Sequence, residues 1–208
     1  YNVVDQIFIG NSELSTLGNA ATGVVFPVFV IAQAFAWCIG DGCAAYLNIC
    51  QGRNDMRTAP KAIGTGVTLT LAASILLLCV FYPLKTQALT LFGASENSIG
   101  MAVEYLEIIL IFFPAFMLSN MMNSVVRADG SPGWAMIAML TGAAINIILD
   151  PLFIFGFHWG MTGAALATGI GQLASFVLCV WYFFLTKTFK LDAKCFVPDF
   201  KAVSGALR

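Results

Sequence analysis

Long stretches without a charged side chain are the feature that most restricts how this chain can fold. A membrane-spanning helix needs about 20 consecutive apolar residues. The sequence offers such stretches repeatedly, at 14–40, 62–84, 108–126, 131–149 and 161–186. Only 10% of the residues are charged and 59% are hydrophobic, whereas a soluble domain carries about a quarter charged residues. We therefore expect an all-α, polytopic membrane protein.

Polar turns divide the chain into six spans. We expect them at about 1–10, 20–50, 59–84, 97–126, 132–156 and 161–187. The turn 129–132 offers Ser131 as a cap and Pro132 at the first helical position, a combination that is typical of a helix start. The first stretch is short and lacks the basic segment and cleavage site of a signal peptide. We expect it to be the end of a helix whose start is missing, and the chain to be a fragment.

The distribution of basic residues predicts the orientation, because cytoplasmic loops are enriched in Lys and Arg. One side of the predicted membrane holds only Lys85. The other side holds Arg53, Arg57, Lys61, Arg127, Lys187, Lys190, Lys194, Lys201 and Arg208. We expect a cell-membrane protein with both ends of the six-span unit in the cytoplasm. Residues 188–208 would be a solvated linker or a segment lying along the interface.

Charge also argues against one class of partner. Lys and Arg together number 10, and Asp and Glu together number 11. This balance gives no basic footprint for nucleic acid. The expected surroundings are the lipid bilayer and a small-molecule substrate.

Ionisable residues within a span cost about 2.5–3.5 kcal/mol on insertion scales, so they usually face an interior and act there. Asp150 shares one helix face with Gly142 and Asn146, each four residues apart. Pro151 follows and leaves the carbonyl of Ile147 without its helical partner. These oxygens favour protonation of Asp150 or binding of Na⁺. The alternative is an Asn–Asp pair that only stabilises helix packing.

Two further carboxylates and two prolines lie within spans. Asp5 is expected in the outer leaflet, either in a functional site or reaching interfacial water. Asp41 would lie about 15 Å from the cytoplasmic end of its helix, and its role stays open between a functional and a water-exposed position. Pro27 and Pro114 free backbone carbonyls, and together with Pro151 they are candidate hinge or cavity residues.

The sixth span repeats small residues every four positions, which allows another helix backbone to approach closely. We interpret this stripe as packing. Thr168 lies beside it, with a hydroxyl that can reach the fifth span. The stripe consists of Gly163, Ala167, Gly171 and Ser175.

Several motifs together resemble the multidrug and toxic compound extrusion (MATE) family of antiporters. Their order and spacing cover essentially all 208 residues. The motifs are Asn2–Gly10 with its Val-Asp and Phe-Ile-Gly, the turn Gln51–Asp55, the Arg-x-x-Gly loop at Val126–Pro132, Asn146–Gly156 and Gly160–Thr168.

The resemblance implies twelve helices in two six-helix lobes that work by alternating access. Residues 1–187 would form the amino-terminal lobe, with a partial first helix, and 188–208 would begin the linker to an absent second lobe. The family's cation site, used by H⁺ or Na⁺, matches Asp5, Asn146, Asp150 and Thr168. Tyr105 corresponds to a tyrosine near that site. No cofactor other than the coupling ion is implied.

The function implied by the resemblance is cation-coupled export of amphipathic, cationic drugs or metabolites. A flippase for lipid-linked oligosaccharides or lipids is the alternative, but it would line its cavity with basic residues, and we expect no Lys or Arg inside any span. An intramembrane aspartyl protease is disfavoured, because Val4-Asp5 and Gly40-Asp41 lack the expected Tyr-Asp and Gly-x-Gly-Asp patterns. A purely structural membrane protein would not need Asn146 and Asp150 beside a proline.

Overall fold

The fold was obtained as a computed structural model that describes residues 2–11, 15–54, 58–186 and 195. Its order of elements is α1 (Asn2–Gly10), α2 (Ser15–Gly52), α3 (Ala59–Leu91), α4 (Ile99–Ala128), α5 (Pro132–Pro151), the short π-helix η1 (Leu152–Gly156) and α6 (Gly160–Leu185). The described residues contain no strand. The predicted all-α class is confirmed.

Five helical segments in the described part of the chain are long and apolar enough to cross a membrane. Their positions agree with five of the predicted spans, and α1 corresponds to the short first one. Of the predicted linker at 188–208, only Cys195 lies among the described residues. It lies beside α3, where its backbone occupies the space next to Gly64.

The expectation that no Lys or Arg lies inside a span is wrong. Helix α3 continues through Lys85, and Arg127 belongs to the last turn of α4. Charges mark the ends of the apolar runs, but the backbone hydrogen bonds of a helix do not need an apolar side chain and continue into the interfacial region. Lys85 forms an ion pair with Glu107 of α4.

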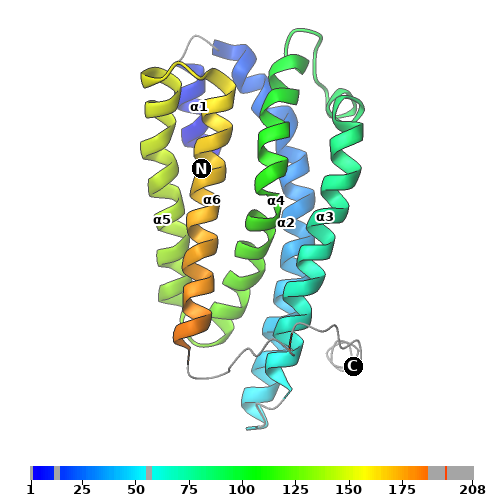
Figure 1. The fold of residues 1–208 in the computed structure, drawn as a ribbon, viewed down its shortest axis with the longest axis vertical. Coiled ribbons are helices and arrows are strands. Elements are labelled where there is room, and N and C mark those ends of the chain that lie inside the picture. The colour runs from blue at the N-terminus through cyan, green and yellow to red at the C-terminus, as the bar shows by residue number, and fades with distance from the viewer. Residues whose placement is uncertain (1, 12–14, 55–57, 187–194, 196–208) are drawn as a thin grey trace.

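Helix α4 is the centre of the bundle and packs against α2, α3, α5 and α6 (Figure 1). Helices α2, α4 and α6 run in one direction, whereas α3 and α5 run in the other. Short α1 packs against α2, α5 and α6. We call the end of the bundle with the α4–α5 loop the Gly130 end, and the end with the connection from η1 to α6 the Gly160 end.

Large apolar side chains lie on the outside of the bundle as well as in its core. Leu76, Ile111 and Phe184 are 64%, 72% and 84% exposed. A soluble protein rarely exposes large contiguous apolar patches. In a bilayer these side chains contact lipid, or another part of the same protein, and are not exposed to water.

The stripe of small residues on α6 packs against α5 and η1, as the sequence predicts. A Cβ atom on Gly171 would lie 2.7 Å from the carbonyl oxygen of Gly142, and one on Gly163 would lie 3.0 Å from the Cβ of Phe153. Ser175 donates a hydrogen bond of 2.9 Å to the carbonyl of Ala138. Two helix backbones therefore lie in direct contact along this face.

The α4–α5 loop is fixed to the end of α6 by side-chain hydrogen bonds. The hydroxyls of Tyr182 and Thr186 each donate to Asp129 Oδ2 over 2.7 Å. Pro132 begins α5 as predicted, but Ser131 makes no capping hydrogen bond with its side chain. Its Oγ instead lies 2.8 Å from the Tyr182 hydroxyl, so a tertiary contact replaces the predicted local one.

The close approach of α2 and α4 predicts opposite effects for two neighbouring glycines. A Cβ on Gly40 would lie 2.9 Å from the Cα of Met121, whereas one on Gly42 would have nothing within 4 Å. Gly40→Ala should lower stability by about 1–3 kcal/mol, because helix backbones must separate. Gly42→Ala should leave stability unchanged or raise it, because Ala favours a helix by about 1 kcal/mol over Gly.

Thermal unfolding of the two variants in the same detergent checks this prediction. An equal change in midpoint for both would show that the α2–α4 contact is not close at Gly40.

Candidate functional site

Four side chains predicted for a cation site converge from three helices, of which α1 is distant in sequence from the consecutive helices α5 and α6. Asp5 comes from α1, Asn146 and Asp150 from α5, and Thr168 from α6. They are between 0% and 4% exposed. The predicted one-turn spacing of Asn146 and Asp150 on α5 places both side chains toward the same neighbours.

A chain of hydrogen bonds joins these four side chains. The Asn146 Nδ2 group donates to Asp150 Oδ1 over 3.2 Å and lies 3.4 Å from Thr168 Oγ1. The Thr168 hydroxyl donates to Asp5 Oδ2 over 3.2 Å. The carboxyl groups of Asp5 and Asp150 are also close enough to interact directly. The predicted Asn–Asp pair exists, but it is part of a larger network.

Each of the three acidic or amide side chains keeps one buried oxygen without a hydrogen-bond partner. These atoms are Asp5 Oδ1, Asn146 Oδ1 and Asp150 Oδ2. A buried, unsatisfied oxygen is costly, and two adjacent carboxylates repel each other. A proton shared by the pair, or a monovalent cation held by these oxygens, would remove both penalties. The residues present therefore fit H⁺ or Na⁺.

Tyr105 of α4 faces this network across a small cavity. It is 3% exposed and lines, together with Asp5, a space of about 20 Å³, which is enough for about one water molecule. The remaining lining residues are Gln6, Thr22, Phe26 and Phe29. The structure thus places Tyr105 near Asp5, as the resemblance implies.

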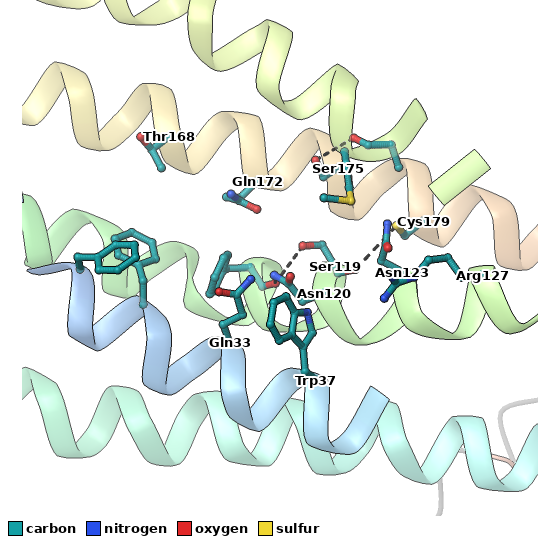
Figure 2. A pocket seen from close by; sticks show the side chains of 15 residues that line it. Gln33, Trp37, Ser119, Asn120, Asn123, Arg127, Thr168, Gln172, Ser175 and Cys179 are labelled. Atoms are coloured by element: carbon teal, nitrogen blue, oxygen red, sulfur yellow. Dashed lines mark hydrogen bonds between the residues drawn. The ribbon is translucent and has the colours of Figure 1, made fainter. Parts of the chain in front are cut away.

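A larger cavity of about 260 Å³ lies between α2, α4 and α6, and Ala138 and Met139 of α5 also line it. Figure 2 shows Thr168 at one end of it and Arg127 with Cys179 at the other. Each helix contributes residues three or four positions apart, so one face of each helix lines the cavity. These faces are Phe26, Phe29, Gln33 and Trp37 on α2, Phe116, Ser119, Asn120, Asn123 and Arg127 on α4, and Thr168, Gln172, Ser175 and Cys179 on α6.

The two cavities are adjacent. Phe26 and Phe29 line both. Thr168 lines the larger cavity and also donates its hydrogen bond to Asp5. A change at the carboxyl pair can therefore reach the wall of the larger cavity through side chains in direct contact.

Other predicted residues lie outside this arrangement. Asp41 is exposed on α2 and lines neither cavity. Pro27 and Pro114 lie within α2 and α4, which continue through them. Pro151 is the last residue of α5, and η1 follows it directly. The predicted disturbance after Asp150 thus takes the form of a π-helical turn.

The sequence reasoning missed most of the larger cavity. Its polar lining consists of uncharged amides, hydroxyl groups and one arginine, and an uncharged polar side chain in an apolar span attracts less notice than a carboxylate. The available signal was the spacing: Asn120, Asn123 and Arg127 follow one another at three or four residues along α4, and Thr168, Gln172 and Ser175 do so along α6.

Comparison with known proteins agrees with this bundle. Residues 1–152 match the MatE family. The multidrug export protein MepA of Staphylococcus aureus (strain NCTC 8325 / PS 47) is 29% identical over 183 residues, which are 88% of this chain and 40% of MepA. MepA of Staphylococcus haemolyticus (strain JCSC1435) is 28% identical with the same coverage.

Solved structures give the same result. A MATE protein in the bent conformation superposes with a TM-score of 0.92 at 26% identity, over 100% of this chain and 46% of that one. A transporter of the MOP superfamily from Pyrococcus furiosus, for which a reverse polarity of the binding pocket suggests a different function, gives a TM-score of 0.86 at 26% identity and the same coverage.

The proteins that match this chain are membrane transporters and not enzymes. The family match covers most of the chain, and the chain belongs to the MatE family of membrane transporters. It spans about two fifths of the length of the curated relatives and just under half of the solved ones.

The Thr168 hydroxyl, which links Asp5 to Asn146, predicts a stability effect. Thr168→Val keeps the side-chain volume but removes the donor to Asp5 Oδ2 and the acceptor near Asn146. It should cost about 1–3 kcal/mol, because buried polar groups lose their partners. Thr70→Val is the matched control, since among the described residues the buried Thr70 hydroxyl donates only to the carbonyl of Gly66 in its own helix.

Thermal unfolding of both variants measures the difference. A loss at Thr168 no larger than that at Thr70 would mean that the hydroxyl does not hold the network together.

Proposed function

We propose that this chain forms the amino-terminal lobe of a cation-coupled antiporter that exports amphipathic small molecules across the cell membrane. The observation that carries the proposal is the buried carboxyl pair of Asp5 and Asp150, with unpartnered oxygens, beside a cavity lined by aromatic rings and amides. Both ends of the lobe would lie in the cytoplasm, and a second lobe would complete the cavity.

The coupling follows from differential binding between two states, since a ligand shifts a conformational equilibrium only by its difference in affinity. One H⁺ or Na⁺ compensates one of the two negative charges of the pair, relieves the repulsion between the carboxylates, and draws α1, α5 and α6 together through Asn146 and Thr168. Movement of Thr168 and of the shared wall at Phe29 changes the larger cavity and releases substrate outward. Loss of the cation to the cytoplasm restores affinity for substrate.

The positions of Tyr105 and of three prolines predict supporting roles for these residues. Tyr105 limits the space next to Asp5 and can donate a hydrogen bond to a water molecule in the small cavity. Pro27, Pro114 and Pro151 remove backbone hydrogen bonds in helices that line or adjoin the two cavities, which allows bending at those places. Asp41 takes no part in cation binding.

The carboxyl pair of Asp5 and Asp150 does not determine which charge the substrate carries. The described lining of the larger cavity includes no carboxylate and one guanidinium, that of Arg127. A relative with a similar fold is itself noted for a reversed pocket polarity, which agrees with variation of this property among transporters of this shape. A flippase is the second candidate function, and the presence of Arg127 at the cavity is the observation that favours it.

Asp150→Asn tests the coupling. The full-length protein, reconstituted in liposomes, should export a fluorescent amphipathic dye when a pH or Na⁺ gradient is imposed. The substitution should reduce gradient-driven export by at least about a hundredfold, because the coupling step loses one of its two carboxylates. Measuring the initial export rate under each gradient separately identifies the ion.

Asp41→Asn is the matched control, because Asp41 is a carboxylate within α2 that lines neither cavity. It should keep most of the wild-type rate. Export by Asp150→Asn at the wild-type rate, with the same dependence on the gradient, would contradict the proposal. Transport of lipid-linked substrates but no dye would favour the flippase.

A further inference from the structure

Aromatic side chains gather at both ends of the hairpin that α5, η1 and α6 form. Helices α5 and α6 pack side by side in this hairpin (Figure 1). At the Gly160 end, three rings contact one another with centroids 5.2 to 6.0 Å apart. They belong to Phe153, Phe157 and Trp159, which we call the Gly160-end cluster. Phe157 and Trp159 are 53% and 48% exposed, so the described part of the chain leaves much of both side chains uncovered.

The backbone of the turn between η1 and α6 holds this cluster together. His158 has a φ of 55°, a left-handed conformation that is uncommon for a residue other than glycine. The Trp159 amide donates a hydrogen bond of 3.0 Å to the carbonyl of Phe153. As a result, the ring centroids of Phe157 and Trp159 lie 5.2 Å apart. The cluster is therefore a fixed feature of this end of the bundle.

A second group of aromatic residues lies at the Gly130 end of the same hairpin. The ring of Trp134 contacts the rings of Trp181 and Tyr182, with centroids 6.3 and 6.1 Å away. The Trp134 indole N–H donates a hydrogen bond of 3.1 Å to the carbonyl of Leu178. Trp181 is 55% exposed. We call Trp134, Trp181 and Tyr182 the Gly130-end cluster, so that exposed indole rings mark both ends of the hairpin.

The distance between the two clusters matches the thickness of a lipid bilayer. Trp159 directly precedes α6, and Trp181 follows it by 22 residues near the end of that helix. Such a helical interval spans about 33 Å, whereas the hydrocarbon core of a bilayer is about 30 Å thick. Trp and Tyr are enriched at both edges of this core, because their apolar rings and polar N–H or O–H groups suit the boundary between acyl chains and headgroups. Both clusters therefore lie at the depth of an interface when the hairpin crosses the membrane.

The surface of α5 between the clusters is apolar and exposed. Its exposed side chains follow one another at intervals of three or four residues, so they share one face of the helix. The opposite face is buried and contains Asn146 and Asp150. An uncharged, apolar face that joins two aromatic clusters is the surface that a helix presents to lipid. The exposed face consists of Ile137, Leu140, Ala144, Ile148 and Leu152.

We propose that the two clusters bind the interfacial regions of a phospholipid bilayer and so fix the depth of the α5–α6 hairpin in the membrane. The rings lie among the upper acyl chains, with their polar N–H and O–H groups directed to ester carbonyls and water. Asp150 precedes Phe157 by seven residues, which is about 10 Å along the helix axis. The Gly160-end cluster thereby holds the carboxyl pair close to one interface. The lining of the two cavities includes no residue of either cluster, so this lipid-binding surface is separate from the proposed transport path.

Quenching of tryptophan fluorescence by brominated lipids tests the proposal, because bromine quenches only rings that it contacts. The full-length protein is reconstituted in phosphatidylcholine that carries bromine either close to the ester group or close to the middle of the bilayer. The signal of Trp159 is the difference between the wild type and Trp159→Phe, and that of Trp181 is obtained in the same way. We expect bromine near the ester to quench both rings at least about twofold more strongly than bromine at the middle, because Trp prefers the interface.

Ile148→Trp is the matched control on the exposed face of α5. Ile148 is 66% exposed and precedes Phe157 by nine residues, so a ring there should lie about 13 Å deeper. Bromine at the middle of the bilayer should quench it more strongly, and this reversed order supports the proposal. Quenching of Trp159 by neither lipid would mean that another part of the protein covers the cluster. Stronger quenching of Trp159 by the deep bromine would place it in the hydrocarbon core, and either result overturns the proposal.

A second measurement tests whether the clusters set the depth of the hairpin. The double substitution Trp159→Leu and Phe157→Leu keeps apolar side chains at two exposed positions but removes the rings. With Ile148→Trp as the reporter in each background, we expect the ratio of deep to shallow quenching to change by at least about 1.5-fold, because interfacial anchors determine how a span lies in the bilayer. Trp37→Leu removes an exposed Trp of α2, outside the hairpin, and should leave the ratio unchanged.

An unchanged ratio in the double Leu variant overturns the proposed anchoring. The quenching of Trp159 in the wild type does not depend on how that variant folds, so it tests the position of the cluster independently. Neither measurement involves transport. Loss of gradient-driven export would therefore contradict the proposed function and leave the lipid-binding surface intact.

Discussion

The rest of this structure depends on two carboxyl groups that are buried side by side in an apolar bundle. Asp5 and Asp150 lie on helices that are far apart in sequence, and neither is exposed by more than 3%. Their charge must be shared, neutralised or hydrogen-bonded, because an uncompensated pair would cost several kcal/mol. Asn146 and Thr168 supply part of this compensation. Asp5 Oδ1, Asn146 Oδ1 and Asp150 Oδ2 remain unpartnered, and the proposed cation would meet them.

This requirement explains features of the helices around the site. Small residues on α6 let it lie directly on α5, so that Thr168 reaches Asn146 and Asp5. The π-helical turn that follows Asp150 ends the regular hydrogen bonding of α5 next to the site, and such turns occur frequently at functional positions. The larger cavity begins where the network ends, with Thr168 common to both. The carboxyl pair and the wall of the larger cavity are thus joined by direct contacts.

Much of this could be predicted from the sequence, because the relevant signals are local. Charge-free runs located the helices, and the spacing of Asn146, Asp150 and Pro151 identified one half of the carboxyl site. The lengths of α2 and α3 were underestimated, because apolar runs report the hydrocarbon core and not the end of a helix. The role of Ser131 was also mistaken, since its partner Tyr182 is 51 residues away. The larger cavity is lined by residues of four helices, and no local sequence pattern contains it.

A titration by infrared difference spectroscopy tests the central claim, that the buried carboxyl pair holds an exchangeable cation. The wild-type protein should show a carbonyl stretching band of a buried protonated carboxyl group that disappears when the pH is raised or Na⁺ is added, with release of a proton to the medium. The same band should be missing from the spectra of Asp150→Asn. A wild-type protein without any carboxyl band that responds to pH or Na⁺ would contradict the account.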